Sequence, residues 1–350
     1  MAAKCAAPAL WSAQLGVGLC AARRQGSGSV WHTYAEQLPK TLSSALAPWS
    51  GDSAALTAWP PTAQRVAVMR ATLQRLHAES APASLGLDEL CWATAIAASR
   101  AYRVRPGTGG EAARLLPVID LANYDTAERA TAEVANAPEG HEPLSVGLLA
   151  TADLAAGTAV TVDYGRGRPL DNERLLLEYG FTLPENAHDS LRLPLGAISA
   201  GLAQVGSLGD GNDGGGEGDG GDGGTAGTQS EEEVAELGAL QAAALAKLGD
   251  VQEHGLQFLA GGEPDEKTTA VARAICARKP AELTATPPSA ALADRASAVL
   301  RVVAACALSE MGEGGAKGHD HDDEEEGDFE QAARSFCESR RVILRRAAAE

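Results

Sequence analysis

The chain has 350 residues, a hydrophobic content of 45% and a formal net charge of -18. This length suffices for one large domain or two ordinary ones, and no apolar run approaches the roughly 18 residues of a membrane-spanning helix. Two acid-rich stretches, 206–233 and 312–328, carry most of the negative charge, so the remainder is nearly neutral. That balance gives no support to nucleic-acid binding through a broad basic face.

The first 40 residues favour two different interpretations. They contain no acidic residue before Glu36 and are rich in Ala, Ser and Arg, as plastid transit peptides are. Alternatively, Leu15, Val17, Leu19 and Cys20 indicate an amphipathic helix that opens a domain. We therefore expect a soluble intracellular protein of the chloroplast stroma or the cytoplasm.

Helices are predicted for the first hundred residues. Within 10–80, the apolar residues Val66, Met69, Leu73 and Leu76 recur at helical spacing. The segment 84–103 has the strongest helical pattern, with one apolar face that includes Tyr102 and with Ser84 as a possible cap.

At residue 115 the helical spacing of apolar residues gives way to short apolar runs that end in turn residues. "LLPVIDLANYD" is a short apolar run that ends in turn residues. "LSVGLLATADLAAGTAVTVDYG" indicates a strand, a turn at Ala156-Gly157 and a second strand. "DNERLLLEYGF" indicates a short helix that Asp171 caps.

The second half contains helices separated by two polar stretches. The Gly/Asp-rich stretch 206–230 and the acidic loop 312–328 are too polar to bury a core, which predicts disorder. Apolar spacing from Val234 to Leu248 predicts one helix, and further helices are predicted to begin near residues 293 and 329.

The cysteines give no sign of a metal site. All six are scattered, and no CxxC pair occurs. This spacing predicts reduced thiols and argues against both a zinc cluster and a disulfide framework.

Three stretches together resemble the SET-domain methyltransferases of the Rubisco large-subunit lysine methyltransferase-like branch. They are "CWATAIAASRAY", "LLPVIDLANYD" and "VTVDYGRGRPLDNERLLLEYGF", which begin at residues 91, 115 and 160. The resemblance implies an α+β fold, in which a SET-domain β core with inserted helices precedes an all-α substrate-binding domain. It divides the chain into a SET domain over 1–198, with a helical insert at about 10–105 and core motifs at 115–181, and a helical domain over 231–350.

The sequence departs from this family at two places. Tyr124 stands where the branch usually has a histidine. The branch also has a β-rich segment upstream of the first matching residues, and its backbone holds part of the cofactor. On this basis we expect either a truncated gene model or a degenerate protein.

By resemblance, eight residues form the site for S-adenosylmethionine and a substrate lysine. Tyr164 would be the catalytic tyrosine, and Tyr179 and Phe181 would line the substrate channel. Asp120, Asn123, Tyr124, Ser99 and Arg100 would bind the cofactor, with no metal required. The alternatives are core aromatic residues for the rings, turn chemistry for Asp120 and Asn123, and a surface role for Arg100.

The resemblance implies a protein-lysine N-methyltransferase. It would act on a lysine-bearing protein substrate, as a monomer, without binding nucleic acid or membrane. Two alternatives stay open: a protein-histidine methyltransferase, and a catalytically inactive SET-like scaffold that binds protein partners.

Overall fold

The structure is a computed structural model that describes residues 11–42, 55–82, 84–104, 112–136, 146–209, 231–249, 255–311 and 328–349. The chain divides into two compact units, Met1–Leu183 with Asp322–Phe336, and Pro184–His321 with Cys337–Glu350. Both units contain helices and strands, which confirms the predicted α+β class. The domain boundary predicted at residue 198 lies within the second unit.

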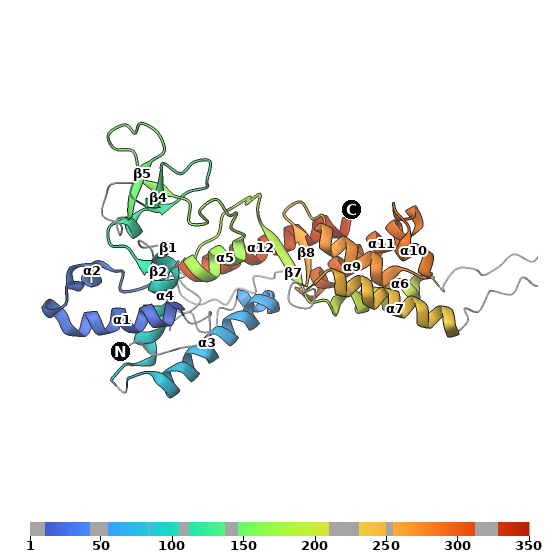
Figure 1. The fold of residues 1–350 in the computed structure, drawn as a ribbon, viewed down its shortest axis with the longest axis horizontal. Helices are drawn as coiled ribbons and strands as arrows, with labels where there is room; N and C mark the ends of the chain where they lie inside the picture. Colours follow the sequence, from blue (N-terminus) through green and yellow to red (C-terminus); the bar gives the residue numbers. More distant parts are fainter. Residues whose placement is uncertain are drawn as a thin grey trace, which may run out of the picture. The chain divides into compact units, whose positions relative to one another are not determined.

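The described residues of the helical insert in the first unit form the α-helices labelled α1, α2, α3 and α4 in Figure 1. They are α1 (Trp11–Gln25), α2 (His32–Gln37), α3 (Pro60–Ser80) and α4 (Leu87–Arg100), with short 3-10 turns η2 (Gly26–Gly28) and η4 (Leu56–Ala58) between them. As predicted, an amphipathic helix covers residues 15–20, where Leu19 and Cys20 are buried. Helix α1 packs along α4.

Helix α4 is more deeply buried than its sequence predicted. All eight residues from Leu90 to Ala97 are buried, so the helix is covered on every side rather than on one face. Its N-cap is Gly86 and makes no side-chain cap, whereas Ser84, the predicted cap, accepts a 2.8 Å hydrogen bond from Arg24 Nη1. The helix ends at Arg100, so the predicted end at residue 103 was wrong.

Strand β1 (Ala101–Val104) follows α4 directly. The continuous burial of α4 gives way there to burial of every second side chain. Tyr102 and Val104 are buried while Arg103 is exposed, which is the two-residue period of a strand. This strand pairs antiparallel with β2 (Ala112–Leu115), with Tyr102 opposite Arg114.

The second sheet of this unit has four strands in the order β3-β6-β4-β5. Their bounds are β3 (Asn123–Tyr124), β4 (Ala132–Asn136), β5 (Val146–Ala150) and β6 (Thr161–Val162), and the 3-10 turn η5 (Ile119–Leu121) precedes β3. Strands β4 and β5 pair antiparallel, whereas β6 lies parallel to both β3 and β4. The chain then forms α5 (Asn172–Arg174) and the π-helical turn η6 (Leu175–Tyr179).

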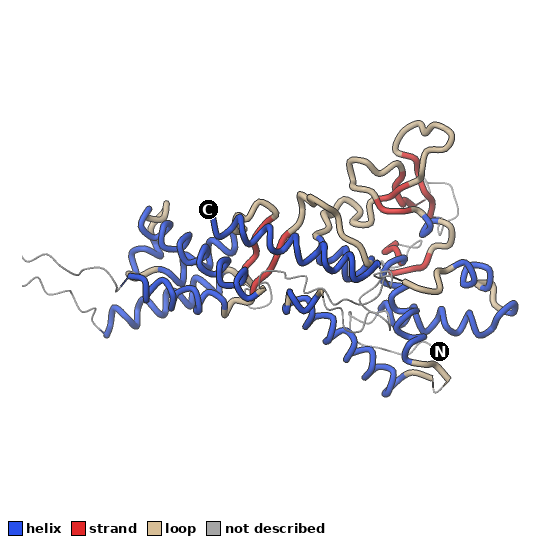
Figure 2. Tube along the Cα trace, turned by 180° about the vertical axis from the view of Figure 1, so that it is seen from behind, coloured by secondary structure: helices blue, strands red, loops and turns tan. Residues whose placement is uncertain are grey.

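The second unit is mostly helical, as predicted, with one added strand pair (Figure 2). Its helices are α6 (Ala197–Gly209), α7 (Glu231–Lys247), α9 (Glu266–Cys276), α10 (Pro280–Thr284), α11 (Ala290–Glu310) and the end of α12 (Asp328–Ala349). Strands β7 (Ser190–Leu193) and β8 (Leu256–Leu259) pair antiparallel. Because α6 extends to Gly209, the predicted linker is helical over 206–209; residues 210–230 and 312–327 lie outside the described part of the chain.

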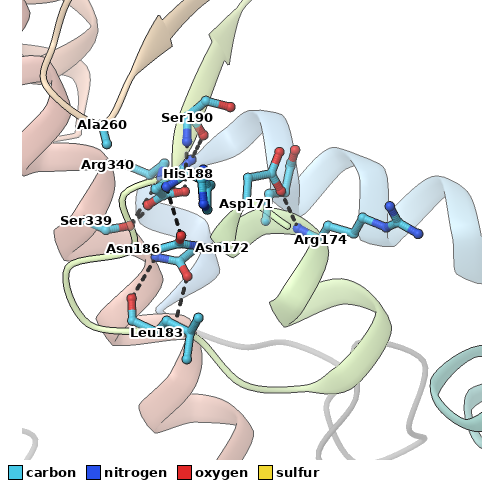
Figure 3. A network of polar contacts seen from close by, with 12 residues as sticks. Asp171, Asn172, Arg174, Leu183, Asn186, His188, Ser190, Ala260, Ser339 and Arg340 are labelled. Atoms are coloured by element: carbon cyan, nitrogen blue, oxygen red, sulfur yellow. Dashed lines mark hydrogen bonds and ion pairs between the residues drawn. The ribbon is translucent and has the colours of Figure 1, made fainter. Parts of the chain in front are cut away.

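A buried ion pair ties α12 to β7 in the second unit. Arg340 is 1% exposed, and its guanidinium contacts the Asp189 carboxylate and the Ser190 carbonyl oxygen. Figure 3 shows Arg340 between Ser339 and Ser190. Asp189 Oδ1 also accepts a 2.9 Å hydrogen bond from the Ser190 amide, so the buried carboxylate is well satisfied.

None of the described helices is both long and apolar enough to cross a membrane. The five cysteines within the described ranges carry free thiols, and all but Cys306 are buried.

Two glycines of α1 allow the effect of helix propensity on stability to be measured apart from the effect of packing. At Gly16, a Cβ would lie 3.0 Å from backbone atoms of Ala93 and Thr94, whereas at Gly18 it would meet nothing within 4 Å. We expect Gly18→Ala to raise the free energy of unfolding by about 0.5–1 kcal/mol. Gly16→Ala should lower it, because the α1–α4 contact must open. Urea denaturation of both variants checks this, and equal stabilisation would contradict the packing.

Arg340→Ala should lower the free energy of unfolding by roughly 3–5 kcal/mol, because it leaves the buried Asp189 carboxylate without its cation. Arg345→Ala, on the same helix, is the matched control. Arg345 pairs with Glu338 at 3.2 Å, but both side chains are more than half exposed. The control should change stability by less than about 1 kcal/mol. Similar losses in the two variants would refute the role of the buried pair.

Candidate functional site

Parallel pairing of two short strands builds the centre of the site. Strand β3 lies beside β6, with Asn123 opposite Thr161 and Tyr124 opposite Val162. The amide of Asp125 continues this pairing with a 3.1 Å hydrogen bond to the Val162 carbonyl. Since parallel strands end at the same edge of a sheet, Tyr124 and Tyr164 emerge next to each other.

The turn that follows β6 requires a glycine at position 165. The Asp163 carboxylate accepts hydrogen bonds from the amides of Gly165 at 2.8 Å and Gly167 at 2.6 Å. A Cβ on residue 165 would lie 1.9 Å from the Arg168 carbonyl oxygen, so only glycine fits. The turn therefore holds Tyr164 against the sheet.

The second tyrosine is held by a helix that ends at the second glycine. As predicted, Asp171 caps α5, and its carboxylate accepts a 2.8 Å hydrogen bond from the Arg174 amide. The helix widens into η6 and stops at Gly180, whose φ of 80° is left-handed. The two Tyr-Gly pairs thus share a purpose, because each glycine allows a sharp change of direction beside a tyrosine.

Four rings, Tyr124, Tyr164, Tyr179 and Phe181, form an aromatic quartet. Ring centroids are separated by 5.4 Å for Tyr124–Tyr164 and by 4.7 Å for Tyr164–Tyr179. Phe181 closes the group at 5.5 Å from Tyr124 and 6.3 Å from Tyr179. These spacings lie in the favourable range for aromatic pairs, so the quartet is a rigid apolar wall with phenol groups at its margin.

Asn172 holds the segment that carries Phe181. The side chain is 2% exposed, and its amide donates to the Leu183 carbonyl at 3.1 Å while accepting from the Leu183 amide at 2.9 Å. This closed pair of hydrogen bonds brings the chain back after Gly180. Phe181 therefore faces the other rings.

A cavity of about 480 Å³ lies beside the quartet. Of the eight residues predicted from sequence, four line it: Ser99, Arg100, Tyr164 and Tyr179. Tyr124 and Phe181 support it through their ring contacts, whereas Asp120 and Asn123 are not among its lining residues. Most of the remaining wall comes from α1, β1, the turn after Tyr164 and the α5–η6 segment, through Trp11, Tyr102, Arg103, Arg166, Arg168, Arg174 and Glu178.

Ser99 and Arg100 already have partners within the protein. Ser99 Oγ donates to the Ala95 carbonyl one helical turn earlier, at 2.9 Å. Arg100 Nη1 donates to the Asp120 carbonyl oxygen at 2.8 Å. The Arg100 Nε atom is buried and has no hydrogen-bond partner among the described residues, so this donor of the guanidinium is unsatisfied within them.

Asp120 is buried below the cavity. Its Oδ2 accepts a 2.5 Å hydrogen bond from the hydroxyl of Tyr34 on α2, while Oδ1 is buried and has no partner within the described ranges. Burial raises the pKa of this carboxyl above its usual range, although Tyr34 and Arg100 act in the opposite direction. Asp120 thus links the helical insert to the sheet.

Asn123 is exposed on β3, and its side-chain amide bonds to no described residue. It sits beside Tyr124 at the edge where the strands end, so a ligand at that edge can reach both residues. The expectation that it binds a cofactor stays a prediction.

The phenols of the site are neutral at physiological pH. Burial raises the pKa of Tyr164 above its ordinary value, and burial together with Glu178 raises that of Tyr179. The Tyr164 hydroxyl donates to the Ala122 carbonyl oxygen at 3.1 Å. Its lone pairs are therefore acceptors toward the cavity, and its proton is already engaged.

Sequence reasoning missed several lining residues. Tyr102 was assigned to a helix face, yet it reaches the cavity from β1, and burial raises its pKa too. The Arg-Gly-Arg that follows the first Tyr-Gly pair was a usable local signal for Arg166 and Arg168. Tyr34 does not line the cavity, and it was not predicted as a site residue because its partner Asp120 is distant in the chain.

Comparisons with known proteins agree on the fold. No family model matches the chain. The ribosomal lysine N-methyltransferase set10 of Schizosaccharomyces pombe is 28% identical over 177 residues, which are 48% of this chain and 31% of that protein. The chain therefore matches less than a third of the length of this curated relative.

Two solved structures cover nearly the whole chain. The SET domain of LSMT bound to MeLysine and AdoHcy is 15% identical with a TM-score of 0.60, over 99% of this chain and 77% of that one. Rubisco LSMT bound to AdoMet is 14% identical with a TM-score of 0.58, over 97% of this chain and 74% of that one. The chain has this SET-domain fold, which confirms the resemblance drawn from the three motifs.

The buried Asp120 carboxyl predicts a specific pH dependence of stability. Because its pKa is raised by folding, the unfolded chain loses this proton first, and the fold loses stability as pH rises from about 4 through the raised value. Asp120→Asn cannot ionise. The melting temperature of Asp120→Asn relative to the parent should therefore increase between pH 4 and pH 7.

Thermal denaturation across this pH range, followed by circular dichroism, measures the difference. Asp153→Asn removes an exposed carboxylate of the same unit and is the control. Its difference from the parent should stay flat. A flat curve for Asp120→Asn as well would show that folding does not raise the pKa of this carboxyl.

Proposed function

We propose that this chain is an S-adenosylmethionine-dependent protein-lysine N-methyltransferase. The observation that carries the proposal is the placement of Tyr164 and Tyr179 on one cavity, their rings 4.7 Å apart, with the Tyr164 hydroxyl fixed on Ala122. The names of the similar proteins support it, because they describe a ribosomal lysine N-methyltransferase and a SET domain bound to MeLysine and AdoHcy.

The residues present fit the cofactor. Arg100 lines the cavity with a buried, unpaired Nε, and a guanidinium suits a carboxylate. Asn123 and the backbone of Tyr124 would hold the amino-acid part, and Ser99 keeps its acceptor lone pairs. When bound, S-adenosylmethionine supplies a methyl group made electrophilic by the sulfonium.

The chain's own residues prepare the acceptor amine. A lysine amine with a pKa near 10.4 is neutral in only about one molecule per thousand at pH 7.4. The rings of Tyr164 and Tyr179 form an apolar wall, which disfavours the charged ammonium and lowers its pKa by desolvation. Holding the neutral amine in one orientation supplies much of the remaining acceleration.

Tyr164 orients the amine as a hydrogen-bond acceptor. Its proton is donated to Ala122, so its oxygen lone pairs can accept an amine N–H. An amine held by its N–H directs its lone pair elsewhere, toward the electrophile. Because burial raises the pKa of this phenol, Tyr164 stays neutral and does not serve as a phenolate base.

Tyr164→Phe removes only the hydroxyl and should lower the single-turnover methylation rate at least tenfold. This corresponds to about 1.4 kcal/mol of lost transition-state stabilisation. Cofactor affinity, measured by calorimetry, should change little because Arg100 and Asn123 are intact. A variant that methylates as fast as the parent would show that the two Tyr-Gly pairs are core features.

Tyr179→Phe is the companion variant and should change the number of methyl groups added more than the rate, because it relaxes the channel. Mass spectrometry of lysine- and histidine-containing peptides measures both the product states and the acceptor. Methylation of histidine alone would replace the lysine assignment. The absence of transfer to either peptide by the parent chain would favour the scaffold alternative.

A further inference from the structure

Arginines crowd the cavity beside the aromatic quartet. Among the described residues that line it, five are arginines, namely Arg100, Arg103, Arg166, Arg168 and Arg174, and one, Glu178, is acidic. They come from the end of α4, from β1, from the turn after Tyr164 and from α5. We call Arg103, Arg166, Arg168 and Arg174 the arginine rim.

The rim charge is poorly neutralised by the described residues. Arg174 Nε pairs with Glu178 at 3.0 Å. Arg166 Nη1 donates to the Arg103 carbonyl oxygen, and the Arg103 guanidinium lies 5.8 Å from the Trp11 ring centroid. No described carboxylate forms an ion pair with Arg103, Arg166 or Arg168. The nearby Asp163 carboxylate instead accepts backbone amides of its own turn.

We infer that the arginine rim binds acidic side chains that flank the target lysine, so that the substrate is a lysine within an Asp/Glu-rich segment of a protein. This inference rests on the proposed function. Guanidinium groups bind carboxylates through paired, charge-assisted hydrogen bonds, and three guanidiniums with no described carboxylate partner at one opening repel one another until an anion arrives. An acidic flank supplies that anion.

The rim disfavours positively charged flanks. Guanidinium groups repel other cations at close range. A basic flank would increase this repulsion without any compensating contact. Acidic residues pair with the rim and carry the lysine to the cavity, while Tyr164 and Tyr179 receive the amine itself.

The rim is a local exception in an acidic chain. The net charge of the whole chain is -18, so a substrate attracted by long-range charge alone would be basic. The rim therefore predicts a preference opposite to the net charge. Nonspecific attraction to the negative chain would favour a basic peptide. A preference for an acidic peptide can therefore be attributed to the rim.

Binding of three fluorescently labelled peptides to the full chain tests the inference without relying on catalysis. Each peptide has one central lysine, flanked on both sides by two Asp, two Ala or two Arg residues. Fluorescence anisotropy at about 50 mM salt should give the acidic peptide about tenfold tighter binding than the Ala peptide. The preference should shrink at 0.5 M salt, where screening is stronger.

Arg166→Gln combined with Arg168→Gln should abolish the preference for the acidic peptide. Arg75→Gln combined with Arg192→Gln removes the same charge from two exposed positions outside the cavity and should leave the preference unchanged. Equal binding of the three peptides by the parent, or a preference that survives in the rim variant, overturns the inference. So does a single-stranded oligonucleotide that binds tighter than the acidic peptide and loses binding in the rim variant.

Methylation of the same peptides separates this inference from the proposed function. Binding preference without methyl transfer would refute the enzyme activity and leave the rim assignment standing. Methylation of the Ala and Asp peptides with equal kcat/KM would refute the rim assignment and leave the enzyme standing.

Discussion

The pairing of β3 with β6 is the constraint on which the site depends. Two residues on each strand, held in parallel register, place Tyr124 and Tyr164 at one edge of the sheet. β6 also lies against β4, where Ala132 and Val162 are buried with Ala122 in a small apolar cluster that Tyr164 covers. Without this central strand, the hydroxyl of Tyr164 would have no Ala122 carbonyl to hold it, and the other rings would lose their common neighbour.

Several of the helices could be predicted from the sequence because their signals are local. Spacing of apolar residues located α1, α3, α7, α11 and α12, and the Asp171 cap located the start of α5. The end of α4 was misplaced because the change from helical to strand periodicity occupies only the four residues 101–104. Strand β8 was missed for a similar reason, since its partner β7 lies far from it in the chain.

The site could be predicted only through resemblance, and only in part. The motifs indicated the four rings and the Ser99–Arg100 helix end, but not what each side chain touches. In the structure, the Ser99 hydroxyl donates a hydrogen bond within its own helix, and the Arg100 guanidinium donates one to the Asp120 carbonyl oxygen. The Tyr34–Asp120 bond joins residues 86 positions apart, and neither local pattern nor composition specifies such a pair. The arginine rim is likewise visible only once three separate elements meet.

The π-helical turn constrains how related sequences can differ. Leu175, Leu176 and Leu177 are all buried, which the wider turn permits, and Tyr179 is its last residue. Such a turn holds one more residue than an α-helical turn of the same height. Removing one residue from 175–178 would restore an ordinary helix and turn Tyr179 by about 100° around the axis. The length of this segment, as much as its residue identities, therefore sets the direction of Tyr179, and we expect relatives that keep the paired tyrosines to tolerate substitutions but no deletions in it.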